Sequence, residues 1–147
     1  MTLVDELEQE VREATLARDT QRRDALRLIL ASLRSAEKEL QRPLSEEEEL
    51  QVLQRERKKR QEAALAFREA GRDEQASGEE AELAVLEEFM PEPLSEEELE
   101  RIVDDAIAEN KATSMRDMGR VMADVMPQIA VRADVSAVSQ LVREKLA

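Results

Sequence analysis

The stretch Glu82–Leu99, with the sequence ELAVLEEFMPEPLSEEEL, ends one helix, breaks the chain and begins another. Leucine and methionine recur at helical spacing in its first half. Pro91 and Pro93 then stop that helix, because each lacks an N–H and disfavours the α region for the residue before it. Ser95 and Glu98 can exchange hydrogen bonds as a capping box, which begins the next helix. The stretch is therefore predicted to join two helical parts of the chain.

The composition predicts an all-α protein with aliphatic cores. The chain has 147 residues, of which 41% are hydrophobic and 39% are charged, and its aromatic residues are Phe67 and Phe89 alone. Good helix formers such as alanine, leucine, glutamate and arginine dominate, and no stretch keeps the alternation of a strand. We predict an N-terminal helical domain of about four helices over residues 1–90 and a C-terminal three-helix bundle over residues 91–147.

The charge of the chain limits the partners that it can take. The formal net charge is −13, and both parts are acidic, with net charges of −8 before Pro91 and −5 from Pro91 onward. A long polyanion is repelled by such a chain at a distance, so nucleic-acid contact requires local cationic patches. The chain has no cysteine and no apolar run of transmembrane length, and its acidic start does not resemble a signal peptide. We expect a cytoplasmic protein that binds neither DNA nor membranes.

Apolar periodicity predicts a long second helix over about Gln21–Gln41, the spine of the first domain. A third helix follows Ser45 and Glu48, which form a second capping box, although Glu49 takes the position where a hydrophobic staple needs an apolar residue. The middle of this helix, Gln54–Glu62, has nine residues without an apolar side chain. We therefore expect that segment to face no core.

Further boundaries follow from glycine, proline and polar stretches. Gly71 suits a left-handed cap at the end of the third helix, and Asp73–Gly78 is predicted to be a loop or a frayed helix start. Beyond the proline break, the methionines of Met115–Met126 fall on one stripe of a helix. Pro127 is predicted to stop that helix, and Gln128–Ala133 is then expected to be a linker.

The residue types that are missing exclude most enzyme chemistry. Histidine, cysteine, tyrosine and tryptophan are absent, which removes Ser-His triads, Cys-His pairs and imidazole metal sites. The three glycines are far apart, so no glycine-rich phosphate loop exists. Asp105 and Glu109 lie one helical turn apart, but a solvated face explains them better than a cation site. We predict no catalytic residue, no metal site and no cofactor.

Three features have both a functional and an ordinary structural interpretation. A run of cations on the third helix could contact phosphates, but we favour a solvated face: Arg55, Arg57, Lys58, Lys59 and Arg60. The methionine stripe could be an adaptable docking groove, but we favour a role in the core of the second domain. Gly119 costs roughly 1 kcal/mol relative to alanine within a helix, which suggests that either a ligand or a neighbouring helix approaches it closely.

Several motifs follow one another along nearly the whole chain: Leu26-Arg27-Leu28; Arg60 through Phe67 to Ala70-Gly71-Arg72; Glu80-Ala81-Glu82-Leu83 to Leu86-Glu87-Glu88-Phe89-Met90-Pro91; Met115 through Met118-Gly119-Arg120 to Met122; and Arg132-Ala133-Asp134 with Val138 and Leu141-Val142. In this order and spacing the chain resembles the YqeY-like proteins. These are small bacterial relatives of the tail domain of the B subunit (GatB) of the Asp/Glu-tRNA amidotransferase.

The resemblance implies an N-terminal domain peculiar to YqeY-like proteins and a C-terminal domain like the amidotransferase tail. That tail recognises the body of the tRNA, while amide transfer happens elsewhere in the complex. The resemblance thus implies a tRNA-contact site on the C-terminal domain: Met118, Gly119, Arg120, Arg132, Ala133 and Asp134. We add Arg116 from its charge alone. The family usually has glycine on both sides of the Arg-Ala-Asp motif, where this chain has Val131 and Val135. Because β-branched residues disfavour positive φ, we expect a differently shaped loop.

Two hypotheses follow for the function. The first is a non-catalytic adaptor that associates with tRNA and is related to the tRNA-dependent amidotransferases, which are carbon–nitrogen ligases with glutamine as amido donor. The second is a protein–protein interaction module that binds an amidotransferase subunit or another helical partner through its methionine-lined face or through the joint at Pro91–Leu94. In both cases we expect a monomer or weak oligomer with no catalytic activity of its own.

Overall fold

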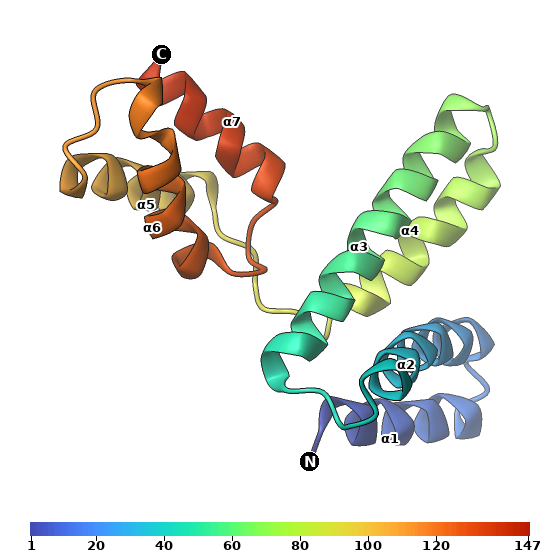
Figure 1. Ribbon diagram of the computed structural model, residues 1–147. Helices are drawn as coiled ribbons and strands as arrows, with labels where there is room; N and C mark the ends of the chain where they lie inside the picture. The colour runs from blue at the N-terminus through green and yellow to red at the C-terminus, as the bar shows by residue number, and fades with distance from the viewer. The chain divides into compact units, whose positions relative to one another are not determined.

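The computed structural model describes all 147 residues, which form seven α-helices and one short 3₁₀ helix and no strand (Figure 1). The chain separates into two compact units, Met1–Met90 and Pro91–Ala147, which we call the N-terminal and C-terminal units. The first unit holds four helices and the second holds three, so the predicted all-α fold is confirmed. None of these helices combines the length and the apolarity that a membrane span requires.

The N-terminal unit consists of two helical hairpins around a leucine-rich core. Helix α1 (Leu3–Leu16) pairs with α2 (Thr20–Leu40), and α3 (Glu46–Glu69) pairs with α4 (Asp73–Glu87). Helix α2 also contacts both α3 and α4, so it is the central element of the unit. The core contains only aliphatic side chains, and its largest fully buried members are Leu7, Leu26, Leu33, Leu53 and Leu86.

The turn between α3 and α4 has the left-handed cap that was predicted at Gly71. Gly71 has φ +74°, and the N–H of Arg72 donates to the carbonyl of Phe67 at 2.7 Å, which satisfies one of the last carbonyls of α3. Helix α4 then begins at once at Asp73, so of the two alternatives predicted for residues 73–78 the loop is wrong and the helix start is found. The reason is Ala76, which is fully buried and holds the first turn of α4 in place.

Glu49 lies where a hydrophobic staple would need an apolar side chain, yet it is only 8% exposed. Its Oε2 accepts a hydrogen bond of 3.2 Å from the N–H of Leu3, one of the unpaired donors at the start of α1. Burial raises the pKa of the Glu49 carboxyl, and nearby glutamates add to this, whereas the hydrogen bond from Leu3 lowers it. The staple is therefore replaced by a charged group that joins α3 to α1.

We expect Glu49→Gln to stabilise the protein at neutral pH, because glutamine keeps an acceptor oxygen for Leu3 and removes the buried charge. A carboxyl with a raised pKa stabilises the fold below its ordinary pKa and loses this contribution as the pH rises. The gain in melting temperature should be about 2–4 °C at pH 7.5 and should vanish near pH 3.5. Thermal unfolding at both pH values measures it. Glu47→Gln, an exposed neighbour on the same turn, should show no gain at either pH.

The C-terminal unit packs three short helices around a smaller, valine-rich core. They are α5 (Glu96–Glu109), α6 (Met118–Ile129) and α7 (Val135–Leu146), and the 3₁₀ helix η1 (Met115–Asp117) leads into α6. The most deeply buried side chains are Val103, Val121, Val125, Ile129, Val138 and Val142. Met118, Met122 and Met126 pack against this core, whereas Met115 stays 46% exposed. The methionine stripe is thus mainly part of the core, as we favoured.

Helix α6 does not stop at Pro127 as predicted but continues to Ile129. Proline removes one backbone hydrogen bond within the helix, yet the fully buried Ile129 holds the last turn against the core. The predicted linker over residues 128–133 is accordingly displaced to residues 130–134. Local proline chemistry is outweighed here by the burial of one side chain.

Candidate functional site

The first group of candidate residues lies around the start of α6. The Oδ2 of Asp117 accepts hydrogen bonds from the N–H groups of Thr113 at 2.9 Å and Ser114 at 3.3 Å, which fix the turn that leads into the helix. The Thr113 N–H, followed by Arg120, lowers the pKa of the Asp117 carboxyl, so this group is ionised at neutral pH. Arg120 pairs with Asp117 and remains 59% exposed, while Arg116 is exposed and has no intramolecular partner.

Gly119 lies at the second position of α6 and is exposed. A Cβ atom built at this position would have no other heavy atom within 4 Å. The expectation that a neighbouring helix approaches Gly119 closely is therefore wrong. The surface at Gly119 is open, and the approach of a ligand to it stays a prediction.

Arg132, in the loop between α6 and α7, holds that loop to the start of the C-terminal unit. Its Nε donates to the carbonyl of Glu92 at 2.8 Å, and its own carbonyl accepts from the N–H of Leu94 at 2.9 Å. Both contacts connect segments about forty residues apart. Arg132 thus has a structural role that its motif did not indicate, although its two terminal nitrogens make no bond within the chain.

The same loop contains one strained residue. The N–H of Arg132 donates to the carbonyl of Ile129 at 2.8 Å, and Ala130 between them has φ 45° and ψ −122°, which favours glycine. Val131 and Val135 both keep negative φ. This agrees with the preference of β-branched residues, and the positive φ of this loop lies at Ala130. A loop shaped differently from the family's stays a prediction.

The remaining loop residues serve the packing of α7. Ala133 packs against the core of the unit. Asp134 is exposed, and its Oδ1 accepts from the N–H of Ser136 at 3.2 Å, which caps the helix. Because α6 rises by about 1.5 Å per residue, roughly 15 Å of helix separates Gly119 from Ile129. The predicted site residues thus form two groups at opposite ends of α6 rather than one cluster.

The basic run of α3 divides into residues with different surroundings. Arg60 is only 20% exposed and forms ion pairs with Glu56 at 3.6 Å, Glu79 at 3.3 Å and Glu82 at 3.4 Å. Arg57 is half-buried and donates to the side chain of Gln54. No residue of the polar segment 54–62 is buried or belongs to the hydrophobic core, as expected. Arg60 is half-buried, and glutamates of α3 and α4 neutralise it.

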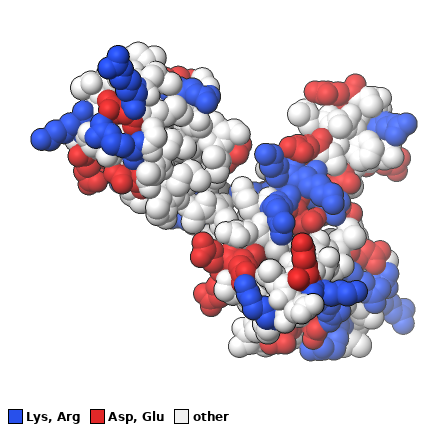
Figure 2. Space-filling model, viewed as in Figure 1, with Lys and Arg blue, Asp and Glu red and all other residues white.

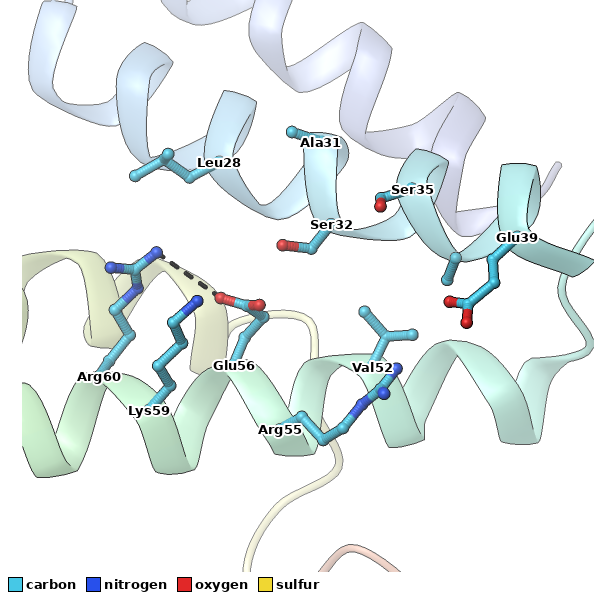
Figure 3. Close-up of a pocket in the computed structure, with 11 residues that line it drawn as sticks. Leu28, Ala31, Ser32, Ser35, Glu39, Val52, Arg55, Glu56, Lys59 and Arg60 are labelled. Carbon is cyan, nitrogen blue, oxygen red and sulfur yellow. Dashed lines mark ion pairs between the residues drawn. The ribbon is translucent and has the colours of Figure 1, made fainter.

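The other three cations of the run, Arg55, Lys58 and Lys59, are exposed and make no ion pair. Arg55 and Lys59 line a groove of about 550 Å³ between α2 and α3. Figure 3 shows Lys59 and Arg60 pointing from α3 across this groove toward α2, where Ser32 lies. The solvated-face interpretation thus describes part of the run, whereas Arg60 belongs to the interior.

Glu82 contributes the carboxylate of the Arg60 ion-pair network whose hydrogen bonding is incomplete. Its Oε2 is buried and has no hydrogen-bond partner. Burial raises the pKa of the Glu82 carboxyl, Arg60 opposes this rise and Glu79 adds to it. One arginine therefore compensates three carboxylates, and the network depends on its single cation.

We expect Arg60→Met to lower the free energy of unfolding by about 1–3 kcal/mol, because it leaves partly buried carboxylates unpaired. Loss of Arg60 should raise the pKa of Glu82 further. The loss in free energy of unfolding should therefore grow as the pH rises above the usual pKa of glutamate, and it should shrink as the pH falls. Urea denaturation at pH 5 and pH 8 measures this. Arg68→Met, which breaks an exposed pair with Glu80 on the same helix, should cost no more than about 1 kcal/mol. Equal losses in the two variants would contradict the account.

Comparison with known proteins identifies the family. A family model described as a Yqey-like protein matches residues 4–146 of this chain. The chain belongs to the YqeY-like family. The resemblance predicted from the sequence motifs is thus confirmed.

A curated relative adds a second comparison. Over 88 residues the chain is 39% identical to the E subunit of the glutamyl-tRNA(Gln) amidotransferase of Thermococcus gammatolerans. The match covers 57% of this YqeY-like chain but only 14% of that relative. The chain therefore corresponds to a small part of a much longer protein. In the structure of this chain, no group of three or more carboxylates is arranged to hold a metal ion.

The strained loop of this YqeY-like chain gives a direct test of the local geometry. Ala130→Gly should raise the free energy of unfolding by about 1 kcal/mol, because glycine adopts the observed backbone angles without a Cβ clash. Ala133→Gly, three residues further along, should lower it, because Ala133 keeps negative φ and packs against the core. Chemical denaturation followed by circular dichroism compares the two. A loss of stability in Ala130→Gly would show that the turn is not formed as described.

Proposed function

We propose that this protein is a non-catalytic adaptor that associates with tRNA, related to the tRNA-dependent amidotransferases. The observation that carries this proposal is the 39% identity with one component of a glutamyl-tRNA(Gln) amidotransferase. The matching part is 14% of that relative, and this chain contains no histidine, cysteine or tyrosine that could serve as a nucleophile or base. An RNA-binding or positioning role therefore suits the chain better than amide transfer. We further propose that the C-terminal unit is the counterpart of the amidotransferase tail.

The contacts that we propose for the C-terminal unit are to phosphates. Arg116 is exposed and unpaired, Arg120 is largely exposed, and the open surface at Gly119 lies between them. Arg132 holds the far end of α6 and keeps two terminal nitrogens for a ligand. Phosphate contacts position an RNA without reading its sequence, so they need none of the stacking aromatics that this unit lacks. Met118, Ala133 and Asp134 then support the positions of these groups.

The decisive comparison is between two double variants of the full chain. Arg116→Glu with Arg120→Glu should weaken binding to unfractionated tRNA by about tenfold or more, since each phosphate contact contributes to affinity. Arg101→Glu with Arg143→Glu reverses two exposed charges of the same unit and changes the net charge equally. This control should bind tRNA several-fold more tightly than the first variant. Fluorescence anisotropy at low salt measures both, and circular dichroism verifies folding. Equal affinities would contradict the proposed contacts.

A second candidate function is a protein–protein interaction module. It is favoured by the relative being one component of an amidotransferase and by the exposed side chain of Met115 next to Arg116. The docking surface would be small, because the other methionines of the stripe pack against the core. This alternative predicts a complex with an amidotransferase subunit or another helical partner that survives nuclease treatment. Loss of the complex after nuclease treatment would favour the adaptor.

A further inference from the structure

Sequence reasoning missed a group of arginines on α1 and α2. A groove of about 560 Å³ runs between these helices, and Arg12, Arg27 and Arg34 line it together with one carboxylate, Glu8. Glu8 pairs with Arg34. Arg12 and Arg27 are exposed and make no ion pair or hydrogen bond within the chain. Arg27 belongs to the family motif Leu26-Arg27-Leu28, but no motif links the three arginines, so only the packing of α1 on α2 reveals that they share one groove.

This groove lies beside the groove between α2 and α3, and the two share one lining residue, Ala31 of α2. Arg27, Arg34 and Lys38 follow one another at helical spacing on the exposed side of α2. The small side chain of Ala31 keeps the ridge between the grooves low. Figure 2 shows Lys and Arg gathered over α3 and again over the α1–α2 pair. We call this surface, with its cations Arg12, Arg27, Arg34, Lys38, Arg55 and Lys59, the α2 face.

The charge of the α2 face is opposite to that of the chain. The N-terminal unit has 15 basic and 23 acidic residues, yet three arginines and one glutamate line the first groove. In the second groove Arg60 is neutralised by its glutamates, which leaves Arg55 and Lys59 without a partner. The two grooves together are lined by six cations and three carboxylates, Glu8, Glu39 and Glu56, so a local excess of positive charge remains here although the unit is acidic.

We propose that the α2 face binds the phosphodiester backbone of a folded RNA. Arginine presents a planar fork that matches phosphate oxygens, and the hydroxyls of Ser32 and Ser35 in the second groove can donate to the same oxygens. An acidic helix of a partner protein would need apolar anchors. The grooves offer only Leu28, which is 44% exposed, as a large accessible apolar side chain. This inference rests on the proposed function and adds a second contact surface for the same RNA.

The test compares two double charge reversals in the full chain. Arg27→Glu with Arg55→Glu places one carboxylate in each groove. Arg18→Glu with Arg72→Glu changes the net charge equally at two exposed arginines without ion pairs, which lie in the α1–α2 and α3–α4 turns outside both grooves. The first variant should bind unfractionated tRNA about tenfold more weakly than the second. Its slope of log affinity against log salt should be smaller by roughly 2. Circular dichroism should show both variants folded.

Each outcome separates this inference from the proposed function. Equal affinities of the two variants, with tRNA still bound, would overturn the inference alone. A defect in Arg27→Glu with Arg55→Glu, together with tRNA binding that does not depend on Arg116 and Arg120, would overturn the proposed C-terminal contacts and support the α2 face. An absence of tRNA binding by the unaltered protein would overturn both. Competition by polyglutamate as effective as that by tRNA would assign the α2 face to an acidic protein and overturn the inference.

Discussion

The break at Pro91 and Pro93 is the constraint on which the rest of the structure depends, because it obliges each half of the chain to bury its own apolar side chains. With only two phenylalanines in the chain, both cores are aliphatic, leucine-rich in the N-terminal unit and valine-rich in the C-terminal unit. Short helices are unstable singly, so most apolar residues pack in one of the two cores, and the large apolar side chains that stay exposed are scattered along the chain. Charged side chains are therefore the main groups left for contact with a partner.

The N-terminal unit also contains a half-buried ion-pair network that composition does not reveal. Helix α3 crosses the unit with a segment that has no apolar side chain, and Arg60 allows this segment to pack by neutralising glutamates of α3 and α4. The same arrangement removes Arg60 from the surface and leaves Arg55 and Lys59 on it. A structural ion-pair network and a candidate binding surface thus come from adjacent turns of one helix.

Sequence reasoning succeeded where the deciding interaction is local. The capping boxes at Ser45 and Ser95 and the left-handed Gly71 each involve residues within a few positions of one another. It failed where the partner is distant along the chain. The hydrogen bond from Leu3 to Glu49 spans 46 positions and that from Arg132 to Glu92 spans 40, and neither has a sequence motif. For the candidate site, Arg116 follows from its charge and Arg120 from the family resemblance, whereas the shared grooves of the α2 face could not be predicted from the sequence.

This acidic member of the YqeY-like family is proposed to contact a folded RNA through local cationic groups, while its overall charge repels long polyanions. The most direct test is the salt dependence of tRNA binding by the unaltered protein, measured by anisotropy between about 50 and 200 mM salt. Phosphate contacts release counterions, so the account predicts saturable binding with a slope of log affinity against log salt of about −2 or steeper. A slope near zero, or no binding at the lowest salt concentration, would contradict it.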